Sequence, residues 1–342
     1  MKRTFRILLV FYGVVILLIA SCRKSTSVVS NISTVSTTTV DYTQLNSLFN
    51  GLQPYAQNIK VNAGTYQTVR AAGGTVLRFY PHSFRDKIGN FITNGVVNIQ
   101  ITEMYNPGAM LANRSSETSN GKLLNCGGQV NIKATINGMD VFANKYGIEF
   151  LASKPSTEPF NLFYGVKGAD SVVNWGLSSA PTGTSAYGTT IDSFLIVSVD
   201  TNGHTLDTMV VRTNYNKFDS CTSFDWISCS SFFASGGAVT DIYATPTDTL
   251  FNNSNTTVFL IFPDINSIAP VNHYNASSRT FSLNSGYEVP VGVKVHLVAI
   301  ANVSGTYYYF QQKNVNITNG IQFSPMLTRS TLNQIIASIM TL

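Results

Sequence analysis

The residues best suited to covalent chemistry in the body of this chain are three cysteines, Cys126, Cys221 and Cys229. An odd number leaves at least one thiol unpaired. Cys221 and Cys229 could form a disulfide in an oxidising compartment, but the run Phe224 to Ile227 between them reads as a strand. Eight extended residues span about 26 Å, whereas the Cα atoms of a disulfide lie within about 7 Å of each other. A strand and a disulfide exclude each other unless the chain bends. The sequence therefore leaves two alternatives, a Cys221–Cys229 disulfide and two buried free thiols.

Other catalytic and metal-binding patterns are missing from the sequence. The four histidines show no His-x-x-x-His spacing and the cysteines no Cys-x-x-Cys spacing, so zinc is not predicted. There is no Gly-x-Ser-x-Gly elbow and no phosphate-binding glycine loop. Asp219 and Asp225 could act as the paired carboxylates of a glycosidase, although each also fits a turn or a cap. We therefore predict no catalytic residue, no metal and no cofactor, and keep a hydrolase with an unrecognised site as an alternative.

Aromatic residues are the remaining candidates for ligand binding. Sugar-binding modules use aromatic faces as flat apolar platforms, with polar neighbours that satisfy hydroxyl groups. Within the run YYYF at residues 307–310, alternate side chains point to opposite faces of a strand, so half of them belong to a core. Binding and packing both stay open for the candidates Trp175, Trp226, Tyr307 and Tyr309.

The fourth cysteine, Cys22, follows a basic start and an apolar run over residues 7–20, which is the order of a secretory signal. As a helix this run would be about 21 Å long, short of the ~30 Å hydrocarbon core of a membrane. The residues LIASC at positions 18–22 resemble the bacterial lipobox, in which the cysteine is acylated and becomes the mature N-terminus. We therefore predict a lipoprotein signal peptide over residues 1–21 and attachment to the membrane through lipid at Cys22.

Composition favours an extracytoplasmic β protein. Of 342 residues, 44% are apolar and only 11% are charged, compared with about a quarter charged in a typical soluble domain, so Ser, Thr and Asn must keep the surface polar. The formal charge of +5 falls to +2 without Lys2, Arg3 and Arg6 of the leader. This small charge gives no support to nucleic-acid binding.

Short apolar alternations bounded by turn residues dominate the chain beyond about residue 48. Residues 97–101 and 130–136 alternate as half-buried strands do. The dipeptides Asn137-Gly138 and Asn202-Gly203 tolerate positive φ and predict hairpins. Later strand-like runs cover residues 257–262, 293–300, 307–310 and 321–323. Many short strands without βαβ spacing predict an all-β fold of tandem antiparallel, Ig-like β-sandwich domains.

The end of the chain departs from the strand pattern and predicts a short C-terminal amphipathic helix. Four apolar residues recur at helical spacing, with Ser330 or Thr331 available as N-cap and Gln334 placed for a capping box. These apolar residues are Leu332, Ile335, Ile336 and Ile339. We expect this helix to cover one end of the last sandwich.

The domain organisation follows from these patterns. After the signal peptide we predict a Ser/Thr-rich tether over residues 22–48 and a β-sandwich domain over residues 49–155. Residues 156–342 form a second β-sandwich region that carries the C-terminal helix, either as one domain or as two. Pro155 and Pro159 mark the boundary, because proline cannot donate a hydrogen bond to a sheet.

A family resemblance covers most of the predicted mature chain. The motifs GGTVLRFYPHSF at residues 73–84, GVVNIQITEMY at 95–105 and CGG at 126–128 resemble a module of uncharacterised lipoproteins of the Bacteroidota. The start of this module is also similar to the ZU5-like β-sandwich. FDWISC at 224–229 and PVGVKVHLVAIA at 290–301 resemble the usual continuation in the same group. The resemblance implies a cell-envelope lipoprotein and brings no catalytic residue.

Localisation and function follow as expectations. Surface-exported lipoproteins of that group tend to carry acidic residues after the cysteine, whereas Arg23 and Lys24 follow Cys22 here. This favours the periplasmic face of the outer membrane over the cell surface. We expect a lipid-anchored, non-enzymatic protein of the cell envelope that acts as an adhesion, scaffold or interaction module, with an envelope protein or a glycan as partner. The first alternative is a glycan-binding lipoprotein accessory to polysaccharide uptake.

Overall fold

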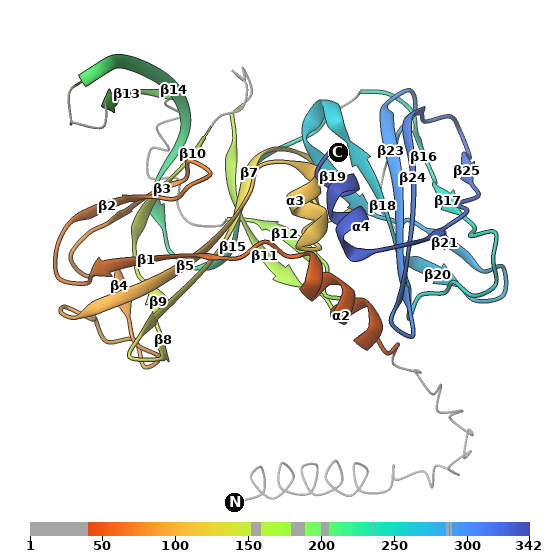
Figure 1. The fold of residues 1–342 in the computed structure, drawn as a ribbon, viewed down its shortest axis with the longest axis horizontal. Helices are drawn as coiled ribbons and strands as arrows, with labels where there is room; N and C mark the ends of the chain where they lie inside the picture. Colours follow the sequence, from red (N-terminus) through yellow and green to blue (C-terminus); the bar gives the residue numbers. More distant parts are fainter. Residues whose placement is uncertain are drawn as a thin grey trace, which may run out of the picture. The chain divides into compact units, whose positions relative to one another are not determined.

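The computed structural model describes residues 40–151, 159–178, 189–199, 205–234, 236–284, 287 and 289–342. Over these residues the chain is mostly β-strand, which confirms the predicted all-β class; the Ig-like type stays a prediction (Figure 1). The described helices are α2 (Thr43–Leu52), α3 (Pro107–Ala112), α4 (Leu332–Ile339) and the 3₁₀ helix η1 (Pro263–Ile265). The predicted signal peptide and the lipidation site Cys22 lie outside the described residues.

Two antiparallel sheets contain most of the strands up to residue 232. Sheet 1 has the order β1-β5-β7-β15-β11-β12, and sheet 2 has the order β13-β14-β10-β3-β2. The strands of sheet 1 are β1 (Gln57–Asn62), β5 (Val96–Met104), β7 (Lys122–Ile136), β15 (Asp225–Phe232), β11 (Asn161–Lys167) and β12 (Val173–Leu177), with β6 (Thr118–Ser119) and β8 (Met139–Asp140) paired to β7. Those of sheet 2 are β13 (Thr189–Val199), β14 (Thr205–Cys221), β10 (Tyr146–Leu151), β3 (Val76–Phe79) and β2 (Gln67–Arg70). A short pair, β4 (Phe84–Arg85) and β9 (Phe142–Ala143), completes this part.

Two further sheets contain the strands after residue 238. Sheet 3 consists of β19 (Ser267–Pro270), β18 (Thr256–Phe262), β23 (Lys294–Val303), β24 (Thr306–Asn316) and β26 (Thr328–Ser330), in that order. Sheet 4 consists of β20 (His273–Asn275), β21 (Thr280–Ser282), β17 (Tyr243–Ala244) and β25 (Gln322–Phe323), in that order. The strands β16 (Val239–Thr240) and β22 (Val289–Pro290) form a separate pair. The pairing of β17 with β25 is parallel.

Each pair of sheets encloses an apolar cluster, as expected of a sandwich. Ile99 and Ile132 of sheet 1 pack in one cluster with Leu77 and Phe79 of sheet 2. Ile99 and Ile132 belong to the alternating runs predicted as half-buried strands, and that prediction is confirmed. A second cluster lies between sheets 3 and 4, where Leu260 of β18 and Phe281 of β21 are buried.

A third apolar cluster lies between sheet 1 and sheet 3 and contains the helices. Phe259 of β18 belongs to it, although its neighbour Leu260 belongs to the cluster on the other face of sheet 3. Leu48 of α2 and Ile335 of α4 pack into the same cluster, as does Phe163 of β11. Sheet 3 is therefore buried on both faces at β18, which explains why this strand continues, after two buried threonines, as the unbroken apolar run VFLIF.

Strand pairing crosses the boundary that the sequence places after residue 155. Strands β10 and β7 precede that residue, yet β10 pairs with β14 and β7 pairs with β15. The break between sets of sheets comes instead after Phe232, between β15 and β16. Prolines near residue 155 identify a connection between strands, but they carry no information about which distant strands pair.

The C-terminal helix α4 was predicted from the sequence, whereas the N-terminal helix α2 was not. The structure forms α4 with Thr331 as N-cap, and a reciprocal capping box links Thr331 and Gln334. The helix α2, by contrast, begins at Thr43, inside the region predicted as a tether, so the tether prediction is wrong from that residue on. Leu45, Leu48, Phe49 and Leu52 recur at helical spacing and are buried. The high Ser/Thr content of the preceding residues obscured this pattern.

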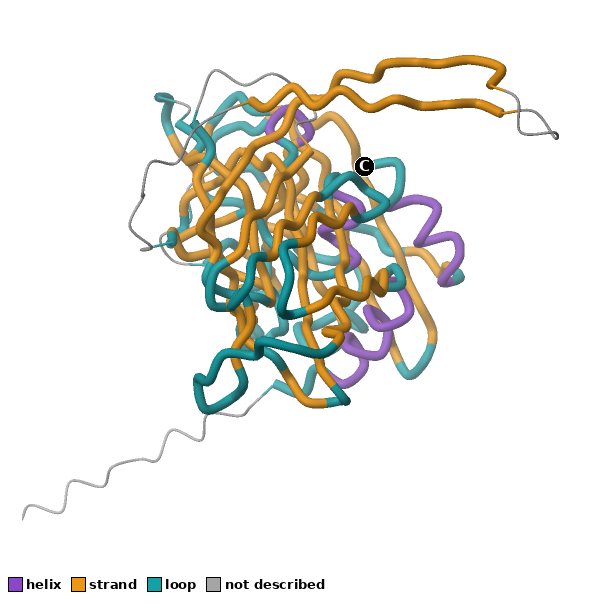
Figure 2. The backbone as a smooth tube through the Cα atoms, turned by 90° about the vertical axis from the view of Figure 1, so that its left-hand side faces the viewer, coloured by secondary structure: helices purple, strands orange, loops and turns teal. Residues whose placement is uncertain are grey.

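The strands β13 and β14 form a hairpin of which only one end belongs to the wider sheet. β10 pairs with β14 over Tyr215–Cys221, whereas β13 pairs with β14 along its whole length. Figure 2 shows the two strands continuing as a two-stranded ribbon. The hairpin predicted around Asn202-Gly203 therefore exists, although these two turn residues lie outside the described ones.

Candidate functional site

The candidate site is an open groove on the face of sheet 1 that points away from sheet 2. The register places Thr102, Asn131, Trp226 and Gly165 side by side on four neighbouring strands. Successive residues of a strand point to opposite faces. Because Ile132, next to Asn131, lies in the core between sheets 1 and 2, this row points away from that core.

The groove has a volume of about 670 Å³. Its floor comes from β5, β7, β15 and β11, and its wall comes from the end of α2, the segment that follows α2, and the residue after α3. Five carboxamide side chains line it: Asn50, Gln53, Gln100, Asn113 and Asn131. The ring of Tyr55 is fully exposed at the same place.

This lining is suited to a ligand rich in hydroxyl groups. A carboxamide offers two hydrogen-bond donors and an acceptor without a charge. An exposed aromatic ring such as that of Tyr55 offers an apolar face beside these polar groups. The combination fits the alternating hydroxyl and C–H surfaces of a sugar.

Two lysines and one carboxylate supply the charges of the groove. Lys133 of β7 and Lys167 of β11 both line it, together with Asp225 at the start of β15. One Asp225 oxygen, Oδ1, accepts a hydrogen bond of 2.7 Å from Asn131 Nδ2. Partial burial lowers the pKa of Lys167, and the nearby positive charges of Arg114 and Lys133 lower it further, against the opposing effect of Asp225. Lys167 therefore lies near two other cations, Arg114 and Lys133, and one carboxylate, Asp225.

The two tryptophans predicted as ligand-binding candidates have different positions. Trp226 lines the groove, but only 7% of its surface is exposed, and the Lys167 ammonium lies 5.0 Å from the centre of its ring. Trp175 is buried in the cluster between sheets 1 and 3, and its indole N–H donates to the Ser116 carbonyl. Trp175 therefore contributes to packing, which is one of the two roles that the sequence left open, and it is not available as a ligand-binding platform.

Tyr307 and Tyr309 also pack rather than line the groove. Both contact the cluster between sheets 1 and 3 from β24, whereas Tyr308 and Phe310 contact the cluster between sheets 3 and 4. The predicted alternation along this strand is confirmed. Burial raises the pKa of Tyr309 well above its ordinary value. Of the four aromatic candidates, Trp226 is the one placed at the groove.

Beside the groove, the same face of sheet 1 is covered by a segment that contains a buried acid, Glu117. Its carboxyl group accepts hydrogen bonds from Gln129 Nε2, from Ser228 Oγ at 2.9 Å and from Ser230 Oγ at 3.1 Å. Its backbone N–H donates to the Ile268 carbonyl of β19 at 2.7 Å. Glu117 therefore joins sheet 1 to sheet 3.

The chemistry of Glu117 is set by its burial. The side chain has no exposed surface, and burial raises its pKa to about 7 although the surrounding donors act in the opposite direction. Its hydrogen-bond donors are the neutral side chains of Gln129, Cys126, Ser228 and Ser230, which stabilise a carboxylate less than a cation would. A glutamic acid that titrates near neutral pH was not expected from the sequence, because its burial depends on pairing between distant strands.

The three cysteines of the described chain are free and buried. Cys221 ends β14 of sheet 2, and Cys229 lies within β15 of sheet 1. Residues 225–232 do form a strand, so of the two alternatives the structure has free thiols and not the Cys221–Cys229 disulfide. Burial raises the pKa of Cys126, Cys221 and Cys229, which keeps these thiols protonated.

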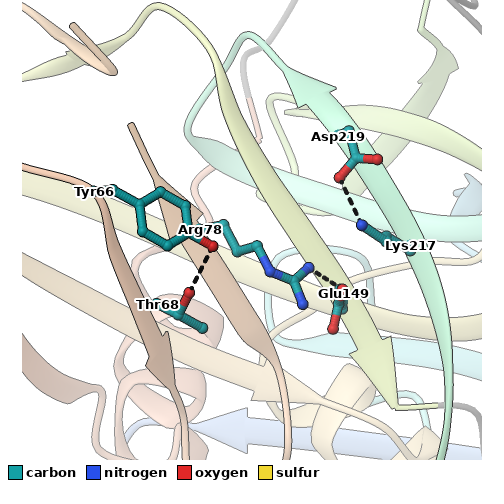
Figure 3. Close-up of polar contacts among 6 residues, drawn as sticks. All are labelled: Tyr66, Thr68, Arg78, Glu149, Lys217 and Asp219. Atoms are coloured by element: carbon teal, nitrogen blue, oxygen red, sulfur yellow. Dashed lines mark hydrogen bonds and ion pairs between the residues drawn. The ribbon is translucent and has the colours of Figure 1, made fainter. Parts of the chain in front are cut away.

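The carboxylates considered as a glycosidase pair do not meet. Asp219 projects from β14 of sheet 2, where it forms an ion pair of 3.3 Å with Lys217 (Figure 3). On the same sheet, Arg78 forms an ion pair with Glu149, and Thr68 donates to the hydroxyl of Tyr66 (Figure 3). Asp219 lines a different cavity from the groove that contains Asp225. The geometry of a paired-carboxylate hydrolase is therefore not formed by these two residues.

The described residues contain neither a metal-binding cluster nor a membrane-spanning helix. No cluster of three or more His, Cys, Asp or Glu side chains in that part of the chain could hold a metal ion. Among the helices of the described part, none is both long and apolar enough to cross a membrane.

Comparison with protein-family models and with curated proteins finds no match for this chain. The resemblance to envelope lipoproteins of the Bacteroidota therefore stays a prediction. The groove itself was missed at the level of sequence because its lining comes from four strands and two helix ends. The polar residues that alternate with core residues, such as Gln100 and Asn131, were its only local signal.

Proposed function

We propose that this chain is a lipid-anchored, non-enzymatic protein of the bacterial outer membrane that binds a glycan in the groove on sheet 1. The observation that carries the proposal is the lining of the groove, which combines five carboxamides with an exposed tyrosine. This places the glycan-binding alternative above an adhesion or scaffold role. An accessory role in polysaccharide uptake, on the periplasmic face, agrees with the predicted anchor at Cys22.

The rigidity of the floor supports a binding role. The four strands that form the floor are paired in one sheet, and their opposite faces are buried in the core between sheets 1 and 2. A preformed surface loses little conformational entropy when a ligand binds. Gln100 and Asn131, which lie on neighbouring strands, therefore present their amides at fixed spacing.

Binding of a polysaccharide panel to the full chain in detergent tests the proposal. Tyr55→Ala and Gln100→Ala remove an exposed ring and an exposed amide without disturbing a core. Each should weaken glycan binding about fivefold, because a contact of this kind contributes roughly 1 kcal/mol. Tyr66→Ala, which removes an exposed tyrosine just before β2 and away from the groove, should leave binding unchanged. Absence of glycan binding, or equal effects of all three variants, would contradict the proposal.

A second candidate is an adhesion or scaffold module that pairs with another protein through the β13–β14 hairpin. β13 is the end strand in the order of sheet 2, and much of the hairpin has no partner in that sheet beyond its own two strands. An edge strand of this kind can accept a strand of another protein. Deletion of residues 189–214 separates the candidates, since it should abolish protein pairing and leave glycan binding intact.

A further inference from the structure

We propose that the glycan bound in the groove is acidic, and that Lys133 and Lys167 bind its carboxylate groups. This inference rests on the proposed glycan-binding function and adds the chemical class of the ligand. Both lysines are exposed on the outer face of sheet 1 and line the groove. One strand, β15, separates them, because β7 and β11 are both neighbours of β15.

Neither lysine is neutralised by the residues that the structure describes. The ion pairs found in that part of the chain are Arg78 with Glu149 and Lys217 with Asp219, both on sheet 2. Asp225, the one carboxylate in the lining, has its Oδ1 atom engaged by Asn131. The lining therefore carries two positive charges against one negative charge.

The surroundings of Lys167 also bear on the binding of an anion. Its ammonium group lies 5.0 Å from the centre of the Trp226 ring, which orients it over the floor of the groove. Arg114, which is buried, lies close enough to interact electrostatically with Lys167. A carboxylate placed near Lys167 would gain mainly from the Lys167 ammonium group, because partial burial reduces screening by water and because Asp170 offsets part of the charge of Arg114.

The remaining lining favours a sugar over other anions. Carboxamides recognise hydroxyl groups, and these are abundant in a uronic-acid polymer and scarce in an acidic peptide. Lysines act as single positive charges without the planar fork of arginine, so they tolerate a carboxylate in several orientations along a repeating chain. An acidic polysaccharide satisfies the amides, the exposed Tyr55 ring and the two ammonium groups together.

Binding of three uronic-acid polymers to the full chain in detergent tests the inference. The probes are polygalacturonate, alginate and hyaluronan, each compared with its own methyl ester, which keeps the sugar backbone and removes the charge. At least one acid should bind at least tenfold more tightly than its ester at 20 mM salt, and the difference should shrink at 300 mM salt. Polyglutamate, the same charge on a peptide, should bind more weakly than the polymer that binds best.

Matched lysine variants locate the effect. Lys133→Gln and Lys167→Gln should each weaken binding of the acid about fivefold and leave binding of the ester unchanged. Lys294→Gln removes the same charge from an exposed position at the start of β23 and should change neither. Because both groove lysines are exposed, these variants should fold normally, which circular dichroism would check.

The possible failures are distinguishable. If esters or neutral polysaccharides bind as tightly as the acids, or only neutral polysaccharides bind, the acidic class is wrong while the glycan-binding function stands. If polyglutamate binds as tightly as every polyuronate, recognition is of charge alone and the inference is overturned. If no polysaccharide binds at all, acidic or neutral, the proposed function falls together with the inference.

Discussion

The buried acid Glu117 makes the stability of this protein depend on pH in a direction opposite to that of a salt-bridged carboxylate. In the folded protein its pKa is about 7, compared with 4.5 as the ordinary value. Between these two pH values the folded protein keeps a proton that the unfolded chain has released. The stabilising effect of this proton is fully present below pH 4.5 and is lost as the pH rises to about 7.

The magnitude follows from the difference between the two pKa values. One pKa unit corresponds to about 1.4 kcal/mol, so the free energy of unfolding should fall by about 3 kcal/mol between pH 4.5 and pH 7.5 through this residue alone. Glu117→Gln should remove this dependence. A neutral amide can accept from Gln129 and Ser228 and donate to Ser230, as the protonated acid does.

Urea unfolding of the two proteins at several pH values measures the effect. Tryptophan fluorescence is a suitable signal, because Trp175 donates a hydrogen bond to Ser116, next to Glu117. Asp140→Asn, which removes an exposed carboxylate at the β7–β8 hairpin, is the control and should follow the wild-type curve. If the free energy of unfolding falls equally in Glu117→Gln and in the wild type as the pH rises, the burial of Glu117 is not the cause of the pH dependence.

Three further predictions concern packing, thiols and the anchor. Gly165→Ala would place a Cβ atom 2.5 Å from Val173 and 2.8 Å from Trp226. It should therefore lower the free energy of unfolding, measured by urea titration, by about 1–3 kcal/mol. An unchanged stability would contradict the close packing of β11 against these two residues. Iodoacetamide at pH 8 should not label the buried thiols of Cys126, Cys221 and Cys229 in the native protein but should label all three in urea, as detected by mass spectrometry. A disulfide-linked pair found after denaturation would contradict the free thiols. Cells fed radioactive palmitate should label the wild type but not Cys22→Ala, and sedimentation of that variant with membranes as before would exclude a lipid anchor there.

Local signals in the sequence were sufficient for individual elements. Alternation at Ile99 and Ile132 placed two central strands with the correct face inward, and the Thr331 capping box placed the last helix. Asn137 and Gly138 both adopt the positive φ that their turn requires. Each of these features depends on residues close together in the chain, and this is why they could be predicted.

Features that depend on distant strands could not be predicted in the same way. β15 pairs with β7 although about 90 residues separate them in the chain. Because of this pairing, the boundary between the two sets of sheets lies after Phe232 and not near residue 155, as the sequence predicted. The same pairing buries Glu117 and brings Asn131 beside Trp226. The site is therefore a property of register, which the periodicity of a single strand does not contain.

Hydrogen–deuterium exchange of the full chain with and without a polyuronate tests the central claim most directly. The account predicts slower exchange in peptides from β5, β7, β11 and β15 and in residues 50–56, where the groove is lined, with no change in the β13–β14 hairpin. Protection confined to the hairpin, or unchanged exchange at the groove under saturating ligand, would contradict it.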